Sequence, residues 1–129
     1  MEKIKDLKTF EDACKMENLD PNKVIPNFSC YSEADRKALE AHAKLLIVVK
    51  AANKIDNDNK EWTPDWNGKF WKNQPYFIMD EGSSGFRYYV CDYWRTNSAV
   101  GSRLCFKTES VCKYIATQFV DLYRDYFMK

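Results

Sequence analysis

Two segments in the last third of the chain contain both tyrosine or phenylalanine rings and basic side chains, which together could bind a ligand. FRYYVCDYW begins at Phe86 and RLCFK at Arg103. Side chains alternate between two faces along a strand. We expect Phe86, Tyr88 and Val90 to face the core, together with Leu104 and Phe106. The opposite face would then carry Arg87, Tyr89, Cys91 and Tyr93 from the first segment and Arg103, Cys105 and Lys107 from the second.

This predicted second face supports two interpretations. Aromatic rings interleaved with cations on an open sheet are typical of single-stranded nucleic-acid platforms, where bases stack on rings and cations meet phosphates. Alternatively, the long N-terminal helix covers the face, because most small sheets are packed on both sides.

Three tryptophans, Trp62, Trp66 and Trp71, punctuate a polar loop. Exposed tryptophans there would anchor a protein partner or stack on sugar rings or bases. The alternative is that they fasten the loop to the core, since a long loop needs apolar anchors to stay folded.

Candidates for catalysis are weak. His42 lies on the apolar stripe of a predicted helix, which favours a half-buried core histidine over a general base. Cys91 and Cys105 would be reactive thiols if Arg103 and Lys107 lay beside them and stabilised the thiolate. Three carboxylates flank the first predicted hairpin: Asp80, Glu81 and Asp92. We expect no catalytic residue, no metal and no cofactor, and regard an enzyme as the minority interpretation.

Composition places the chain among single globular domains. It has 129 residues, 45% hydrophobic and 16% aromatic, with a net charge of +1. Such a balance provides no general attraction to nucleic acid or to anionic membranes. The longest apolar run is too short to span a bilayer. Five cysteines without a Cys-x-x-Cys pair, and no export signal, favour reduced thiols in the cytoplasm.

Helix signals recur along the chain. Thr9 with Asp12 predicts a capping box that opens a short helix from Phe10 to about Glu17. Ser32 with Asp35 predicts a second box before a long helix, about 33–55. Its 45–52 segment is apolar nearly all round, as in a central core helix or a homodimer interface. Thr108 should cap an amphipathic helix that runs to about Phe127.

Three strands are expected between the long helix and the last one: Tyr76–Asp80, Phe86–Trp94 and Arg103–Lys107. The predicted fold is α+β, a three-stranded antiparallel meander backed by the C-terminal amphipathic helix, with a long N-terminal helix and a short preceding one. The single domain 1–129 divides into a helical part (1–56), a Trp-rich loop (57–74) and a strand–helix part (75–129).

The strings WTPDW from Trp62, DYW from Asp92 and GSRLCFK from Gly101 carry a resemblance. With QF at 118–119 and LY at 122–123, they make the chain similar to a group of short, functionally uncharacterised proteins of gut anaerobic bacteria and their phages and mobile elements. That resemblance implies a mobile-element context and provides no catalytic residues.

The expected order of three strands and a helix also resembles the AP2-type and integrase arm-binding DNA domains. Those domains lay a three-stranded sheet into a DNA groove. The resemblance implies DNA contacts from Arg87, Tyr89, Arg95 and Arg103, although this chain has fewer cations on the sheet than such domains normally carry.

These observations together predict a non-catalytic accessory binding module in the cytoplasm, without a membrane segment. Its partner would be nucleic acid, bound by the tyrosine and basic face, or a host protein, bound by the tryptophans. A homodimer formed through the long helix is the related alternative.

Overall fold

The computed structural model describes residues 2–64, 72–79, 85–94 and 103–128. Over these residues the chain has the predicted α+β class. The elements in chain order are η1 (Glu2–Asp6), α1 (Phe10–Met16), α2 (Glu33–Ile55), β1 (Lys72–Met79), β2 (Phe86–Trp94), α3 (Glu109–Gln118) and α4 (Val120–Phe127).

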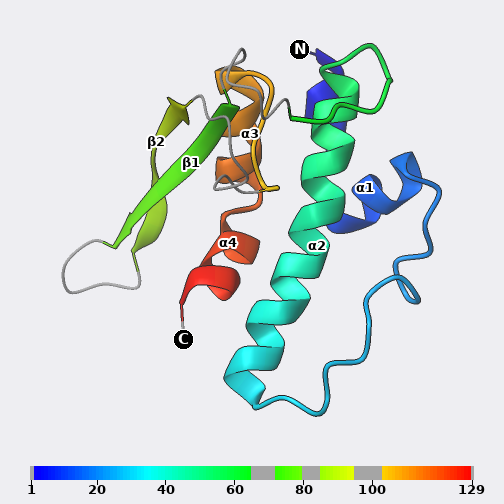
Figure 1. The fold of residues 1–129 in the computed structure, drawn as a ribbon, viewed down its shortest axis with the longest axis vertical. Coiled ribbons are helices and arrows are strands. Elements are labelled where there is room, and N and C mark those ends of the chain that lie inside the picture. Colours follow the sequence, from blue (N-terminus) through cyan, green and yellow to red (C-terminus); the bar gives the residue numbers. More distant parts are fainter. Residues whose placement is uncertain (1, 65–71, 80–84, 95–102, 129) are drawn as a thin grey trace.

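The elements are arranged in layers around α3 and α4. Figure 1 shows the β1–β2 hairpin on one side of these two helices and α2 on the other, with α1 packed against α2. The core between them joins the two halves of the sequence, since Leu45 from α2, Ile115 from α3 and Ile4 from η1 belong to one buried cluster.

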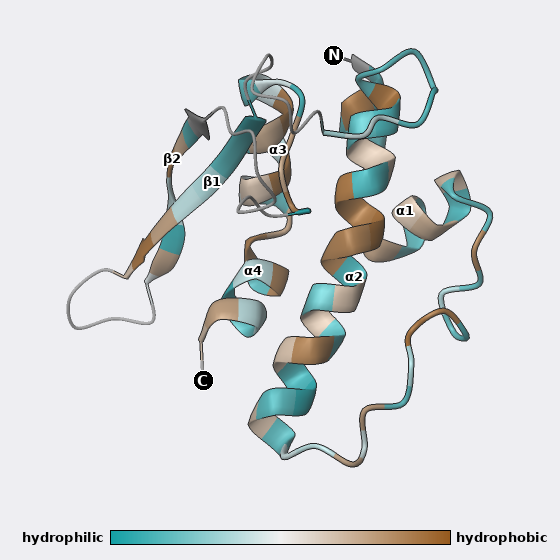
Figure 2. Cartoon of the chain, viewed as in Figure 1, coloured by the Kyte–Doolittle hydropathy of each residue, from teal (hydrophilic) through white to brown (hydrophobic). Residues whose placement is uncertain are grey.

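Helix α2 has the predicted bounds. The Ser32 hydroxyl accepts a hydrogen bond from the Asp35 amide at 3.3 Å, which satisfies one of the donors at the start of the helix. Figure 2 shows hydrophobic residues concentrated in the middle and C-terminal half of α2. Leu45, Val48 and Ala52 are fully buried within the chain. These three side chains therefore belong to the core, whereas Leu46 of the same segment is 36% exposed. Within the described residues, no helix combines the length and apolar character needed to cross a membrane.

The predicted three-stranded meander is wrong for the described part of the chain, which forms a two-stranded antiparallel sheet. β1 also begins earlier than expected, at Lys72, within the segment assigned to the Trp-rich loop. The predicted third strand, 103–107, forms a single bridge, in which Phe106 and Asn73 exchange backbone hydrogen bonds of 2.8 and 3.0 Å.

Asn53 on α2 explains why this segment does not continue as a strand. Its side-chain amide donates to the Cys105 carbonyl at 2.9 Å, and its carbonyl accepts from the Lys107 amide at 3.1 Å. These backbone groups therefore bond to a helix side chain. The side chains also fail to alternate, because Leu104, Cys105 and Phe106 are all buried.

The predicted C-terminal helix is interrupted at Phe119, which separates α3 from α4. The Thr117 hydroxyl donates to the Lys113 and Tyr114 carbonyls at 2.9 and 3.0 Å, a local pattern that often bends helices. After the interruption α4 lies along α2, where Tyr126 stacks on His42 with ring centroids 4.8 Å apart. His42 is thus the half-buried histidine expected from the sequence.

Candidate interaction surface on the hairpin

The register of the hairpin contains a β-bulge. Tyr76 pairs with Val90, whereas the next residue, Phe77, pairs with Tyr88, so Tyr89 has no partner on β1. A bulge adds one residue to one strand and reverses the alternation of faces beyond it. Val90 consequently joins the face of Tyr76, and Cys91 turns inward.

The predicted faces of β2 are therefore correct on one side of the bulge and wrong on the other. Tyr88 packs against the core as expected, and Tyr89 is exposed. Val90, which was expected in the core, is 40% exposed, whereas Cys91, expected on the other face, is buried. No residue type in the sequence marks the bulge, so alternation alone could not locate it.

The inner side of the hairpin is fixed by aromatic packing. The ring of Phe77 lies 4.8 Å from that of Tyr123 on α4 and 4.9 Å from that of Phe86 across the hairpin. Tyr88 packs against the same core. α3 and α4 thus cover this side, and Figure 1 shows α2 beyond them, away from the sheet.

The outer side carries exposed aromatic and apolar side chains, which we call the hairpin face. Tyr76 is 48% exposed and Tyr89 60%. Ile78 lies two residues after Tyr76 on β1 and therefore points to the same side of the sheet. Its cross-strand partner, Arg87, shares that side. The hairpin face therefore comprises Tyr76, Ile78, Arg87, Tyr89 and Val90. Tyr76 was missing from the predicted site because its partner on β2 depends on the bulge.

The structure separates the three predicted cations. Arg87 lies on the hairpin face near the turn, opposite Ile78. Lys107 lies beyond Phe106, which bridges Asn73 at the other end of β1, about 17 Å away along the strand. The Lys107 ammonium donates to the Asn57 side-chain oxygen at 3.0 Å, beyond the end of α2. Lys107 therefore holds a loop of the fold and does not extend the hairpin face.

The other predicted binding residues have mixed positions. Arg103 is exposed in the bend that precedes the buried segment 104–106. Tyr93 pairs with Asn73 through the backbone, and its side chain lies outside the described residues. Trp62 is half-buried, while Trp66 and Trp71 lie outside the described residues.

The cysteines expected to be reactive are both buried. Burial raises the pKa of Cys105 to about 11, so the cations predicted beside it do not favour its thiolate. For Cys91, hydrogen bonds from the Cys112 thiol and from the Tyr88 hydroxyl, the latter at 3.3 Å, lower the pKa against the effect of burial. The same contact with Cys91, together with burial, raises the pKa of Cys112. The thiols of Cys91 on β2 and Cys112 on α3 are therefore in contact inside the protein.

No protein-family model, curated protein or solved structure matches the chain. Within the described residues, no group of three His, Cys, Asp or Glu side chains is placed to hold a metal ion. The hairpin face offers exposed aromatic rings on a sheet that is anchored from behind.

Proposed function

We propose that the chain is a non-catalytic binding module that contacts a protein partner through the hairpin face. The observation that carries the proposal is the grouping of Tyr76, Tyr89 and Val90, all substantially exposed, on the side of the sheet opposite the helices. Contiguous exposed apolar side chains of this kind mark interaction sites on soluble proteins.

The residue types of the hairpin face support a protein partner. Tyrosine and arginine are enriched among the residues that dominate binding energy at protein interfaces, and lysine is depleted there. The bulge places two of the exposed residues, Tyr89 and Val90, next to each other on one strand. Because Phe77 anchors the hairpin to Tyr123 from behind, these rings are presented without a large ordering cost on binding.

The charges on the hairpin face favour a protein partner over nucleic acid. Arg87 is the predicted cation that lies on the hairpin face, and Asp92, exposed and paired with Gln74, lies on the same side of β2. These two charges cancel. Nucleic-acid affinity comes largely from several cations that neutralise phosphates. Neither Lys107 nor the buried Lys72 adds charge to this surface.

Site-specific crosslinking tests the proposal. Tyr89 is replaced by a photoreactive benzophenone amino acid, and the protein is irradiated in host lysate. Tyr31, 50% exposed in the loop before α2, provides a matched control position. We expect one protein, or a second copy of this chain, to crosslink from position 89 and not from position 31. Equal crosslinking from both positions would contradict the proposal.

Binding experiments with labelled single-stranded DNA and RNA test the alternative that the hairpin face binds nucleic acid. Fluorescence anisotropy at low and moderate salt should show no saturable binding. Saturable binding that weakens with salt and is lost in Tyr89→Ala would replace the protein partner with nucleic acid.

A further inference from the structure

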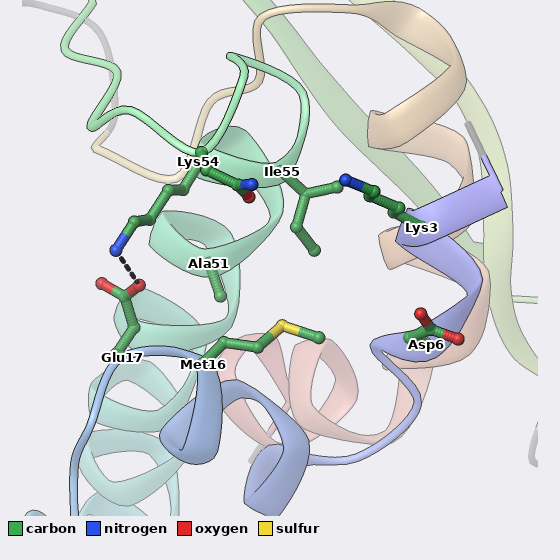
Figure 3. A pocket seen from close by; sticks show the side chains of 8 residues that line it. Lys3, Asp6, Met16, Glu17, Ala51, Lys54 and Ile55 are labelled. Carbon is green, nitrogen blue, oxygen red and sulfur yellow. Dashed lines mark ion pairs between the residues drawn. The ribbon is translucent and has the colours of Figure 1, made fainter.

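A pocket and the strand edges of the hairpin lie outside the hairpin face. The pocket, of about 480 Å³, lies between η1, the end of α1 and the C-terminal turns of α2 (Figure 3). Its buried carboxylate belongs to Glu17, whose side chain is 7% exposed and lies 3.5 Å from the Lys54 ammonium and 4.0 Å from the Lys50 ammonium. These ion pairs fasten the end of α1 to α2, so the buried charge of this pocket serves the fold.

The two edges of the hairpin differ in what they offer to another strand. The outer edge of β1 is met by Phe106 through its backbone bridge to Asn73, and β1 also contains Pro75, which has no N–H to donate. β2 contains no proline, and within the described residues it pairs with β1 alone. Figure 1 shows β2 as the outer strand of the hairpin, with β1 on the side of α2. The edge of an outer strand presents N–H and C=O groups with which another chain can pair.

The bulge makes the pattern of faces along β2 symmetric. Tyr88 packs against the core and Cys91 is buried, whereas Tyr89 and Val90 between them are both exposed. Segment 87–92 therefore runs exposed, inward, exposed, exposed, inward, exposed, and it has the same order from either end. A regular strand is symmetric about every residue, but the bulge leaves a single centre, between Tyr89 and Val90.

This centre specifies how β2 would pair with a second copy of itself. Antiparallel pairing about a two-fold axis at the centre sets Tyr89 opposite Val90 of the other copy, and it keeps exposed residues opposite exposed ones. The neighbouring registers would set exposed side chains opposite inward ones. The same pairing sets Arg87 opposite Asp92 of the other copy, twice, and opposite charges across two strands attract. β2 is thus complementary to itself in both its faces and its charges.

We infer that two copies of this chain associate by antiparallel pairing of their β2 edges. The product is a continuous four-stranded sheet with both hairpin faces on one side. Helices α3 and α4 of each copy cover the other side, and α3 packs against both strands, so it lies under the hairpin. The pairing uses the strand edge and leaves the hairpin face exposed. The inference therefore does not depend on the proposed function, and either can fail while the other stands.

Sedimentation equilibrium of the purified protein tests the inference. We expect a reversible equilibrium between monomer and dimer in low salt, at concentrations up to millimolar. Isotope-filtered NMR on a mixture of labelled and unlabelled wild-type protein should show contacts between Tyr89 of one copy and Val90 of the other. A protein that stays monomeric would overturn the inference, and so would a dimer without these contacts.

Charge-exchange variants connect the dimer to its register. Arg87→Glu should weaken the dimer about tenfold, because two attractive pairs across the interface become repulsive. Adding Asp92→Arg restores opposite charges in both pairs and should return the Kd to that of the wild-type protein. Lys15→Glu, the same change of charge at an exposed position on α1, should leave the Kd unchanged. Thermal melts establish that the variants fold. A double variant that dimerises no better than Arg87→Glu would contradict the register.

Discussion

Tyr123 on α4 packs against the hairpin, and its hydroxyl is buried in apolar surroundings. Its side chain is 1% exposed and its hydroxyl has no hydrogen-bond partner among the described residues. The surrounding rings are close, with Phe77 at 4.8 Å and Phe127 at 6.4 Å between centroids. Burial accordingly raises the pKa of the Tyr123 hydroxyl. Tyr123→Phe should therefore stabilise the fold.

The expected size of this stabilisation follows from the free-energy cost of burying a hydroxyl that has no hydrogen-bond partner. Such a group destabilises the native state by about 1–3 kcal/mol. Removing it keeps the aromatic ring and its contacts, so we expect the free energy of unfolding to rise by about 1–2 kcal/mol. For a chain of this size that corresponds to an increase in Tm of roughly 3–8 °C. Urea unfolding followed by circular dichroism would show it as a higher midpoint at constant slope.

Tyr114 provides a control of opposite sign. Its hydroxyl donates to the Leu7 carbonyl at 3.2 Å and to the Lys5 carbonyl at 3.4 Å. Tyr114→Phe should consequently lower the free energy of unfolding by about 1 kcal/mol. If Tyr123→Phe were instead destabilising by as much as Tyr114→Phe, the Tyr123 hydroxyl would have a native partner, and the described packing of the hairpin would be wrong.

Three further predictions concern the interior and the thiols. Asn53→Ala leaves the buried Cys105 carbonyl and the part-buried Lys107 amide without their side-chain partner, and it should reduce the free energy of unfolding by roughly 2–4 kcal/mol in urea titrations, with Asn57→Ala as a milder control. Because burial raises the folded-state pKa of Cys105 to about 11 from 9.0, its contribution to stability is complete below pH 9 and is lost as the pH rises toward 11. Melts from pH 8 to 11 should show that decline, and Cys105→Ala should make it less steep, while the raised pKa values of Cys14 and Cys112 keep part of it. Cys30 is exposed whereas the other four cysteines are buried, so iodoacetamide at pH 8 should label one thiol rapidly and the rest only on unfolding, as read by mass spectrometry. Rapid labelling of several thiols in the folded protein would contradict the burial described here.

Local signals in the sequence predicted the helices well. The three expected N-caps, Thr9, Ser32 and Thr108, each accept the hydrogen bond that starts a helix. Capping is a property of a few adjacent residues, so it can be recognised without tertiary information. The end of α3 could not, because it depends on how Thr117 bonds to the preceding turn and on the packing of α4 against α2.

Strand pairing depended on contacts that are distant in sequence. The segment around Phe106 has the composition of a strand, yet Asn53, more than fifty residues earlier, bonds the backbone groups that a neighbouring strand would have used. The bulge at Tyr89 likewise arises from the register between β1 and β2. Either feature changes which side chains are exposed, which is why the predicted faces of the strands were only partly correct.

The candidate sites show the same division between local and distant information. Arg87 and Tyr89 were predicted to be surface residues because they lie two positions apart in an aromatic-rich strand segment. Tyr76 and the symmetry of β2 were not predicted, since both depend on the bulge and on the register between the two strands. Neither the residue types nor their spacing reveals that register before folding.

The measurement that tests the central claim most directly is the Kd of the crosslinked partner for Tyr89→Ala, compared with Tyr31→Ala, by isothermal titration calorimetry. Truncating an exposed tyrosine at the centre of an interface typically weakens binding by about 2 kcal/mol or more, about thirtyfold. We expect that loss for Tyr89→Ala and an unchanged Kd for Tyr31→Ala, with equal melting temperatures confirming that both fold. An unchanged Kd for Tyr89→Ala would mean that the hairpin face is not the binding surface.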